Sequence, residues 1–537
     1  MRTPCDEAVM ESAAVAVPCS KEARTWVLAA TILGSSMAFI DSTVVNVALP
    51  ALQASLHATV VDLQWVVESY GVFLAALILV GGSFADRFGR RLIFVAGVLI
   101  FALASAGCGL SSNIDQLIIA RSIQGMGAAL LVPGSLAIIS TSYDEKNRGQ
   151  AIGTWSGFTA ITTAVGPVLG GWLVGHASWR WVFFLNLPIA VAVVAISLWQ
   201  IPETRNAGAG RVDWLGAILA TVGLGSLVTG FVESLNLGWG NSLVFGGLTV
   251  GFGCLVAFLF VEAASPAPTL PLKLFRSRSF SGANLQTFFL YAAIGIFFFL
   301  YPLNLIQVQG YSTTATGAAV LPLILLMFLL SRWSGGLVAH HGSRGPLIVG
   351  PIVVALGFIL FAVPSIGGGY WKEFFPATIV LGFGLAVTVA PLTTVVMNSV
   401  DKDRVGTASG INNAVARVAG VLAIAVLGIV MVKAFGSRLN NSLAHLVLPP
   451  GVLGYLQANE INLANLQVPV GLSSSTKAVV SSSIGQAFVF GFRIVMLICA
   501  GLSLGSAALT WPLIPKVRDR FGLDSTVVPD AGGGRKP

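Results

Sequence analysis

The chain has 537 residues, of which 55% are hydrophobic and only 10% are charged. A soluble globular domain carries about 25% charged residues, so this composition excludes one and indicates many membrane-spanning segments. The formal net charge is +8, but the basic residues are scattered among the predicted loops, which excludes a basic nucleic-acid-binding surface. The five cysteines lie in the N-terminal tail or in apolar runs, and they predict neither a disulfide framework nor a metal site.

The sequence contains fourteen apolar stretches that are each long enough to cross a bilayer, which takes about 20 residues of helix. These predicted spans lie at 26–50, 62–85, 92–110, 115–140, 149–175, 180–201, 212–234, 241–262, 281–305, 313–338, 346–364, 372–396, 406–433 and 486–513. The predicted fold class is therefore an all-α polytopic membrane protein, and we expect it in the plasma or inner membrane of the cell.

Lysine and arginine predict the orientation, because they are enriched in cytoplasmic loops. If the N-terminus is cytoplasmic, the basic residues that fall outside the membrane are Arg180, Lys372, Lys433, Arg438 and Lys477. The other basic residues outside the spans all fall on the cytoplasmic side, so we predict that both termini are cytoplasmic. The segment 436–485 then becomes the one long external loop, which is either a mobile loop or a folded cap.

An internal repeat divides the chain into two halves. A pattern of Asp, Arg, Gly and Ala at 144–153 returns at 401–410, and the glycine spacing of 82–89 returns at 335–342. The offset between the first pair exceeds a six-helix half by about two helices, which predicts two inserted helices between two parallel halves. The predicted parts are a cytoplasmic tail 1–25, an N-terminal half 26–201, two inserted helices 202–263, a C-terminal half 264–515 and a cytoplasmic tail 516–537.

A short charged turn, Gly81-Gly82-Ser83-Phe84-Ala85-Asp86-Arg87-Phe88-Gly89-Arg90-Arg91, joins the second and third spans. Its arginines fix it on the cytoplasmic side, and a topology anchor alone would explain that charge. The full pattern, however, resembles the G-x-L-a-D-r-x-G-r-k loop of the major facilitator superfamily, with Phe84 in the leucine position. The resemblance implies a gating loop that latches the cytoplasmic ends of the N-terminal half when the transporter is open to the outside. Its residues are Gly82, Asp86, Arg87, Gly89, Arg90 and Arg91.

Three charged residues lie deep inside predicted spans of the N-terminal half, where each costs about 2.5–3.5 kcal/mol on insertion scales and needs a reason. Asp41, Glu68 and Arg121 all sit roughly 9–13 Å below the outer boundary at 1.5 Å per residue, so we expect them to meet in one layer. Such a cluster is either a proton-coupling site or an ion pair that only holds helices in register. The sequence leaves open whether Asp41 or Glu68 is the main proton carrier. Arg417 is a buried charge of the C-terminal half with no obvious acid beside it.

The fifth span is rich in small residues: Gly153, Gly157, Gly166, Pro167, Gly170 and Gly171. Spacings of the G-x-x-x-G type allow close helix contact, and ordinary packing is the simpler explanation of any one of them. The whole set resembles the antiporter motif of exporters, although Thr162 replaces one expected glycine. In the fourth span, the segment that begins at Arg121 resembles the R-x-x-q-G-x-g-a-a motif of the same superfamily.

The segment 39–50 completes the resemblance, because it is similar to the l-D-x-T-v-v-n-v-A-L-P pattern of the fourteen-span drug:proton antiporters. The likeness extends over 26–515. It implies two six-helix halves plus two inserted helices, and a monomer that exports small, largely hydrophobic compounds by alternating access. It further implies no enzyme activity and no cofactor, since a proton gradient drives transport, and no partners other than the substrate, protons and the lipid bilayer. The tenth span contains no acidic residue, which argues against dicationic substrates.

Other functions remain as alternatives or are excluded by specific residues. A dedicated exporter of one natural product is fully compatible with the sequence. A proton-coupled uptake permease of the same fold is a weaker alternative, because uptake members generally lack the glycine pattern of the fifth span. An ATP-driven pump needs G-x-x-x-x-G-K-[ST], and no Gly-Lys pair occurs in the chain. The G-x-S-x-G match at 501–505 lies inside an apolar span, where a nucleophile elbow does not form.

Overall fold

The computed structural model describes residues 21–143, 145–205, 213–265, 268–400, 404–444, 446, 448–449, 451–469 and 472–514. Within these residues the regular structure is entirely helical, and fourteen helical segments are long and apolar enough to cross a membrane. The protein is therefore a multi-pass membrane protein. Most of the two predicted tails, together with Asp144 and Asp401 of the repeat, lies outside the described residues.

The N-terminal half contains six membrane-spanning segments. Its helices are α1 (Lys21–Leu56), α2 (Val60–Phe88), α3 (Arg90–Leu110), α4 (Ile114–Ser142), α5 (Glu145–His176), α6 (Trp181–Phe184) and α7 (Asn186–Gln200). The predicted sixth span is thus divided into a single turn, α6, and a longer helix, α7. Helix α2 begins with a capping box in which Thr59 and Asp62 exchange hydrogen bonds, and this fixes its first turn.

Two inserted helices, α8 (Trp214–Leu237) and α9 (Ser242–Ala264), follow the N-terminal half. Helix α8 packs against α9, α2 and α15, and the indole of Trp65 on α2 donates a 2.7 Å hydrogen bond to Glu233 on α8. Helix α9 is mostly exposed, with Phe245, Phe252 and Phe260 each about two-thirds or more uncovered. Exposed aromatic side chains on an apolar helix are expected where lipid replaces water.

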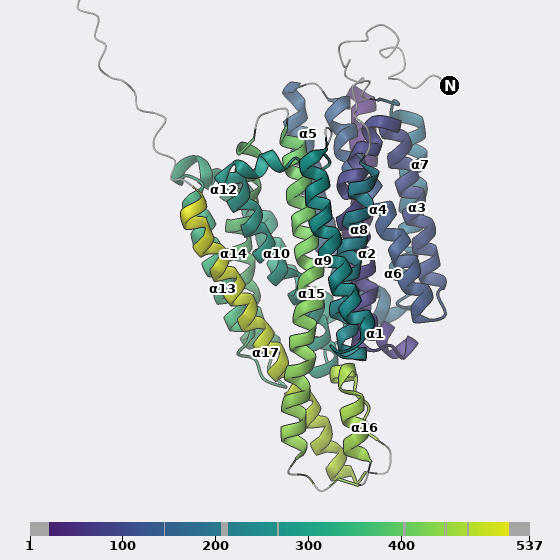
Figure 1. Ribbon diagram of the computed structural model, residues 1–537, viewed down its shortest axis with the longest axis vertical. Coiled ribbons are helices and arrows are strands. Elements are labelled where there is room, and N and C mark those ends of the chain that lie inside the picture. The colour runs from purple at the N-terminus through teal and green to yellow at the C-terminus, as the bar shows by residue number, and fades with distance from the viewer. Residues whose placement is uncertain are drawn as a thin grey trace, which may run out of the picture.

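The C-terminal half again contains six membrane-spanning segments, two of which are interrupted. Its elements are η2 (Leu272–Arg276), α10 (Arg278–Leu303), η3 (Asn304–Val308), α11 (Thr313–Ala319), α12 (Leu321–His341), α13 (Arg344–Phe361), α14 (Tyr370–Asn398), α15 (Val405–Leu443) and α17 (Ser474–Leu513). The short turn η3 is a π-helix that continues α10. In Figure 1 the later helices of this half lie to the left and the early helices of the chain lie to the right.

The segment 436–485 is largely helical. Helix α15 continues to Leu443 and α17 already begins at Ser474, with α16 (Val452–Ala458) and η5 (Glu460–Asn465) between them. Leu456 and Leu463 are buried in this lobe, which hangs below the bundle in Figure 1. Of the two predicted alternatives, the described residues form a folded cap. We call this end of the bundle the cap end, and the opposite end, where Gly89 joins α2 to α3, the loop end.

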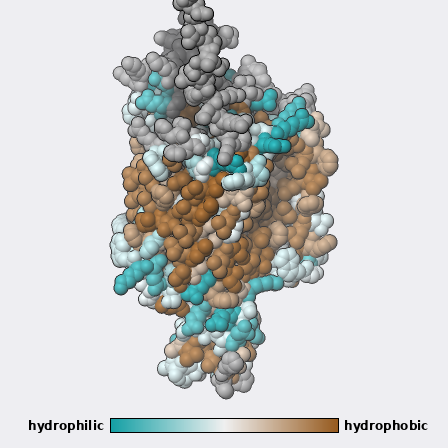
Figure 2. All heavy atoms as spheres, turned by 90° about the vertical axis from the view of Figure 1, so that its left-hand side faces the viewer, coloured by the Kyte–Doolittle hydropathy of each residue, from teal (hydrophilic) through white to brown (hydrophobic). Residues whose placement is uncertain are grey.

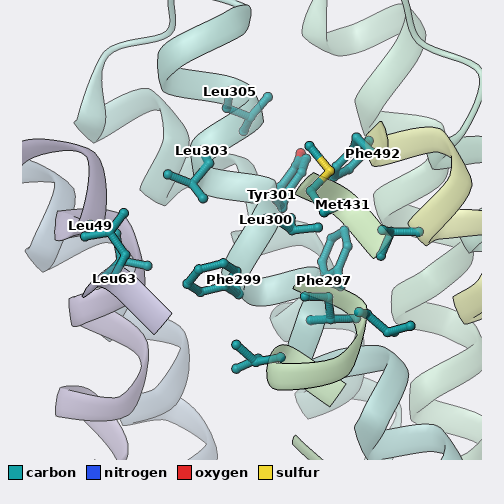
Figure 3. Packing of buried hydrophobic residues seen from close by; sticks show 14 of the residues in the cluster. Leu49, Leu63, Phe297, Phe299, Leu300, Tyr301, Leu303, Leu305, Met431 and Phe492 are labelled. Carbon is teal, nitrogen blue, oxygen red and sulfur yellow. The ribbon is translucent and has the colours of Figure 1, made fainter. Parts of the chain in front are cut away.

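One large hydrophobic core connects the two halves on the cap side. Figure 3 shows Leu49 and Leu63 of the N-terminal half facing a group of residues from α10, with Met431 and Phe492 beyond them. Phe297 stacks on Tyr301 at a centroid distance of 4.9 Å and lies 4.8 Å from Phe361. Figure 2 shows a hydrophobic band between two more polar ends, which is the surface that a bilayer-embedded protein needs.

Candidate functional site

The buried centre of the N-terminal half is an ion pair between α1 and α4. The Nη1 of Arg121 donates to Oδ2 of Asp41 at 2.5 Å, and the two side chains are 2% and 0% exposed. The Nε of Arg121 donates to the backbone carbonyl of Val66 on α2 at 3.1 Å. Its guanidinium carbon also lies 4.3 Å from the ring centroid of Tyr70. The structure therefore brings Asp41 and Arg121 together, as the sequence predicts.

Neutral polar side chains complete this ion pair. Gln124 accepts a hydrogen bond from Arg121 at 2.6 Å and donates one to Oδ1 of Asp41 at 2.8 Å. Asn186 on α7 and Gln124 both donate to the hydroxyl of Ser105 on α3. Both oxygens of the carboxylate thus have a donor, and five helices of the half, α1, α2, α3, α4 and α7, contribute to this layer. Such extra hydrogen bonds are what allow a buried ion pair to offset its desolvation cost.

Glu68 does not join this layer, contrary to the sequence-based expectation. Val66 and Tyr70, which contact Arg121, lie on one face of α2. Glu68 lies on the other face, one turn from Gln64, which donates to Ile424 on α15 at 3.0 Å. Residues four apart share a helix face, whereas residues two apart do not. Residue counting thus predicts how deep Glu68 lies in the membrane, but it does not predict to which side of α2 its side chain is directed.

The surroundings of Glu68 are apolar and closed. Val61 and Val72, on the same side of α2, pack in one cluster with residues of α8 and α15. Glu68 is 0% exposed, and within the part of the chain that the structure describes neither of its carboxyl oxygens has a hydrogen-bond partner. A second buried acid therefore stands at the junction of the N-terminal half, the inserted helix α8 and the C-terminal half.

A mostly apolar cavity of about 480 Å³ lies between the two halves. Thr43 on α1, two residues after Asp41, and the predicted motif glycines Gly153 and Gly157 on α5 form part of its N-terminal wall. Its C-terminal wall is formed by Tyr291, Ile294, Phe298, Leu323, Ile324, Met327, Phe328, Ser331, Leu385, Ala386, Val389 and Ala390. Among the described residues, none comes within 4 Å of the position where a Cβ on either glycine would stand, so both keep the wall open rather than enabling a tight contact.

The remaining motif residues of α5 lie in close contacts with other helices instead. A Cβ on Gly166 or Gly170 would collide with Thr43 or Val44 of α1, and one on Gly171 would collide with the backbone oxygen of Thr313. The carbonyl of Pro167 in turn touches the site of a Cβ on Gly317 of α11. The six predicted residues therefore form two groups, with Gly153 and Gly157 at the cavity, and Gly166, Pro167, Gly170 and Gly171 in close helix contacts toward the cap end.

Arg417 reaches from α15 toward the N-terminal half. Its guanidinium carbon lies 5.9 Å from the ring centroid of Phe39 on α1. It is also close enough to Tyr70 and Tyr291 to act on both electrostatically. A cation of the C-terminal half thus lies near the cavity and near the Asp41–Arg121 layer.

The charged turn at the loop end is held by two separate acids. Asp86 accepts hydrogen bonds from Nε and Nη2 of Arg90 at 3.0 and 2.7 Å, within the turn itself. Glu203, after α7, accepts from the backbone amides of Arg91 and Leu92 at 3.2 and 3.0 Å, so its carboxylate caps the positive N-terminus of α3. Gly89 has φ +121°, and a Cβ there would stand 2.5 Å from Oε1 of Glu203. Glycine is therefore required at this position.

Comparison with known proteins decides the family. The model of the Major Facilitator Superfamily matches residues 31–424. The chain belongs to the Major Facilitator Superfamily. It is 34% identical over 452 residues to the multidrug resistance protein Stp of Mycobacterium tuberculosis, which covers 83% of this chain and 82% of that protein. It is 31% identical over 522 residues to the tetracenomycin C resistance and export protein of Streptomyces glaucescens, covering 95% and 96%.

Solved structures agree with this assignment at the level of the fold. An inward-facing, unoccupied bacterial homolog of the human lysosomal transporter Spinster superposes with a TM-score of 0.62 at 16% identity, over 91% of this chain and 98% of that chain.

A third sequence relative, the multidrug export protein EmrB of Escherichia coli, is 32% identical over 403 residues, covering 72% of this chain and 76% of that protein. The predicted fold class and family are therefore confirmed.

Two residues of the predicted gating loop, Gly82 and Arg87, make few contacts in the structure. A Cβ on Gly82 would make only an ordinary 3.8 Å contact with Pro133, whereas a Cβ on its neighbour Gly81 would collide with the backbone of Ala129 on α4. The side chain of Arg87 is exposed and its guanidinium carbon lies 5.8 Å from the adjacent Phe88 ring. The side-chain hydrogen bond from this turn to another segment is made by Arg91, whose Nη1 donates to the carbonyl of Ile201 at 3.0 Å.

Sequence reasoning missed the neutral members of the central layer and the acid at the loop end. Gln124 stands inside the recognised segment of the fourth span, three residues after Arg121, so helical spacing was a usable signal. Ser105 gave no signal, because single small polar residues are common in membrane helices. Asn186 stands in an Asn-x-Pro pattern that is part of the family resemblance, but the sequence predicted no role for it. Glu203 lies far from Arg91 in sequence, and only the fold brings them together. In the described residues no group of three or more His, Cys, Asp or Glu side chains is placed to hold a metal ion.

Proposed function

We propose that the protein exports small, largely hydrophobic compounds from the cytoplasm in exchange for protons. The observation that carries this proposal is the mostly apolar 480 Å³ cavity between the halves, whose α1 wall begins two residues from the fully buried Asp41. Apolar walls with few polar groups bind compounds by burial of apolar surface rather than by directed hydrogen bonds. The functions that the two relatives are named for, multidrug resistance and tetracenomycin C resistance and export, support the same class of cargo.

The central layer supplies the coupling step in this proposal. Protonation of Asp41 removes the charge that holds Arg121 and Gln124, so the helices α1 and α4 lose their strongest mutual contact. Thr43 and Asp41 lie on the same helix, so a movement of α1 changes the cavity wall directly. A proton taken up at Asp41 therefore weakens the substrate site, and bound substrate disfavours protonation. This reciprocity is what antiport requires.

Glu68 is the second carrier in the proposal. An ionised carboxylate without hydrogen-bond partners is strongly unfavourable in an apolar surrounding, so the packing of α2 against α8 and α15 accommodates a protonated Glu68. Release of that proton requires this junction to open or to admit water. The two acids thus respond to different interfaces, one inside the N-terminal half and one between the halves.

The contacts between the halves support an arrangement that is closed at the cap end. Gln307 on η3 donates a 2.7 Å hydrogen bond to Gln53 on α1, and the hydroxyl of Thr313 on α11 donates to the carbonyl of Gly171 on α5 at 2.8 Å. We propose that the cap end faces the outside and the loop end the cytoplasm, as the lysine and arginine distribution predicts. The cavity then receives cargo from the cytoplasmic side.

The test is transport by purified protein in vesicles with an imposed proton gradient. A chemically varied panel of hydrophobic dyes and antibiotics should move against its gradient only while the proton gradient persists, and an uncoupler should stop it. Susceptibility of a deletion strain to the same panel gives the cargo range in cells. Transport that continues without a proton gradient, or no transport of any member of the panel, would overturn the proposal.

A further inference from the structure

Two acids meet where the inserted helices reach the loop end, at a place that the transport mechanism does not use. Asp213 precedes α8 and caps it, because its Oδ1 accepts a 2.8 Å hydrogen bond from the amide of Gly216. Glu262, near the end of α9, is 2% exposed, and its Oε2 accepts a 2.9 Å hydrogen bond from the amide of Leu270. One oxygen of each carboxyl group is thus engaged.

Among the described residues, the other oxygens of the two carboxyl groups interact only with each other. In the described part of the chain, Oδ2 of Asp213 and Oε1 of Glu262 are buried without a hydrogen-bond partner. Both oxygens converge on Gly216, where a Cβ would stand 2.5 Å from the first and 3.1 Å from the second. Two buried acceptors that face each other need a donor between them, and a buried acceptor without one costs roughly 1–3 kcal/mol or more.

An apolar pocket of about 220 Å³ lies beside Gly216, the residue on which these two oxygens converge. Gly216 and Leu270, the two residues whose backbone amides bind the acids, are part of its wall. The rest of the wall is almost wholly apolar and comes from three parts of the molecule: the N-terminal half through α2, the inserted helices α8 and α9, and the C-terminal half through α10 and α15. A ligand here would touch both halves.

We propose that this pocket binds the apolar part of an amphiphile whose primary ammonium group donates hydrogen bonds to Asp213 and Glu262. The charges are opposite in sign, because a cation meets two carboxyl groups. A primary ammonium also carries three N–H donors, whereas a quaternary ammonium carries none. The same chemistry has two sources at this depth, a lipophilic amine or the headgroup of an aminophospholipid, because both acids stand at helix ends near the membrane surface.

The test uses the purified full-length protein in detergent, with no proton gradient, so its outcome is independent of the proposed export. The unfolding temperature is measured against rising concentrations of octylammonium, octyltrimethylammonium and octanol. Octylammonium should raise it, because a ligand that binds only the folded state stabilises it. The quaternary compound and the alcohol should need concentrations at least about tenfold higher for the same rise in unfolding temperature, since neither can form the charged hydrogen bonds.

Two variants address the two parts of the site separately. Asp213→Asn combined with Glu262→Gln removes both charges at constant shape, and Ala220→Phe fills the pocket without changing a charge. Each should weaken octylammonium binding at least about tenfold. Glu233→Gln, at the other end of α8, is the matched control and should bind as the wild type does. If the double variant does not fold, Ala220→Phe still tests the pocket.

The source of the ammonium is identified by native mass spectrometry. A lipid site predicts that phosphatidylethanolamine is retained over phosphatidylcholine with the same chains, and that the double variant loses this preference. A site for free amines predicts no lipid preference but undiminished octylammonium binding. Equal binding of primary and quaternary amines, or unchanged binding in Ala220→Phe, would overturn the proposal, and the two acids would then only share a proton.

Discussion

The two halves of the bundle bury polar side chains in different ways. In the N-terminal half, the first helix contributes Asp41, which pairs with Arg121. In the C-terminal half, the first helix, α10, contributes Thr287 and Asn284, which accept hydrogen bonds from Asn412 on α15 at 2.7 and 3.2 Å. A charge pair holds one layer and neutral hydrogen bonds hold the other. Of these two layers, only the first contains a carboxyl group that can exchange a proton, while the second half supplies most of the apolar cavity wall.

Removing one partner of the ion pair should have the largest effect. Arg121→Leu leaves the Asp41 carboxylate buried and unpaired, so we expect a loss of about 3–5 kcal/mol of stability and no transport. Asn412→Leu is the matched change in the neutral layer and should cost about 1–3 kcal/mol. Unfolding temperatures in detergent measure both. Equal losses of stability would contradict the idea that the charged layer and the neutral layer contribute differently.

Neutralising the acid without emptying its site should separate coupling from folding. Asp41→Asn keeps the shape of the side chain and resembles the protonated form, so we expect a folded protein that has lost proton-driven export completely. Glu68→Gln should also impair coupling. It should leave the unfolding temperature unchanged or higher, because the carboxyl group has no partner to lose. Substrate-induced proton release from purified protein is the measurement.

A control for these two variants lies on the same helix as Glu68. Asp62→Asn changes an acid in the first turn of α2, where its side chain accepts a hydrogen bond from the amide of Thr59, and the Oδ1 of asparagine can accept the same bond. It should leave proton release unchanged. If Asp41→Asn and Glu68→Gln both release protons as the wild type does, the coupling site lies elsewhere and the central layer only ties helices together.

The glycines of α5 allow a test of their division into those that line the cavity and those that lie in close helix contacts. Gly171→Ala places a Cβ against the backbone of Thr313, and backbone cannot yield as a side chain can, so we expect a cost of about 1–3 kcal/mol. It should also favour conformations in which the cap end is open. Gly153→Ala enters free space at the cavity and should leave stability unchanged or slightly higher. Accessibility of a cysteine introduced at Thr314 measures opening, and equal labelling in both variants would contradict the division.

The sequence was sufficient for those features that repeat along the chain. Apolar length predicts the spans, and depth counting placed Asp41 and Arg121 in one layer because a helix rises by a constant amount per residue. Depth says nothing about direction around the helix axis, which is why Glu68 was misplaced. The direction depends on which helices surround α2, and that is a property of the whole bundle.

The cap and the loop end show a second limit. The segment after 433 has few strongly apolar runs, so the continuation of α15 to Leu443 could not be distinguished from a loop by hydropathy. The contact between Glu203 and the N-terminus of α3 joins residues that are distant in sequence. Motif comparison identified Asp86 in the turn, but it could not show that a second acid, outside the motif, caps the helix that follows.

The loop end should show small effects on stability. Asp86 is partly exposed and pairs with Arg90 four residues on, a geometry that is worth about 0.3–0.5 kcal/mol. Asp86→Asn should therefore barely change the unfolding temperature, yet it should bias the transporter toward the inward-open state if the turn is a latch. Glu203→Gln removes the charge that caps α3 and should cost about 0.3–1 kcal/mol. Normal transport and unchanged accessibility in Asp86→Asn would reduce the turn to a topology anchor.

The smallest effect should be a pH dependence of the stability of the cap. Burial raises the pKa of Glu460, while the 2.7 Å hydrogen bond from Asn440 opposes the shift. A carboxyl group whose pKa is higher in the folded than in the unfolded state contributes stability below its unfolded pKa, and this contribution disappears as the pH rises through the folded pKa. The cap should therefore protect its amides from hydrogen exchange best at acidic pH. Glu460→Gln should abolish the dependence, whereas Gln457→Met removes a neighbouring hydrogen bond to Asn440 without a titrating group and should preserve it. Because Glu460 is only partly buried, we expect a change in protection of a few-fold at most, and a cap that is better protected at alkaline pH would contradict the assignment.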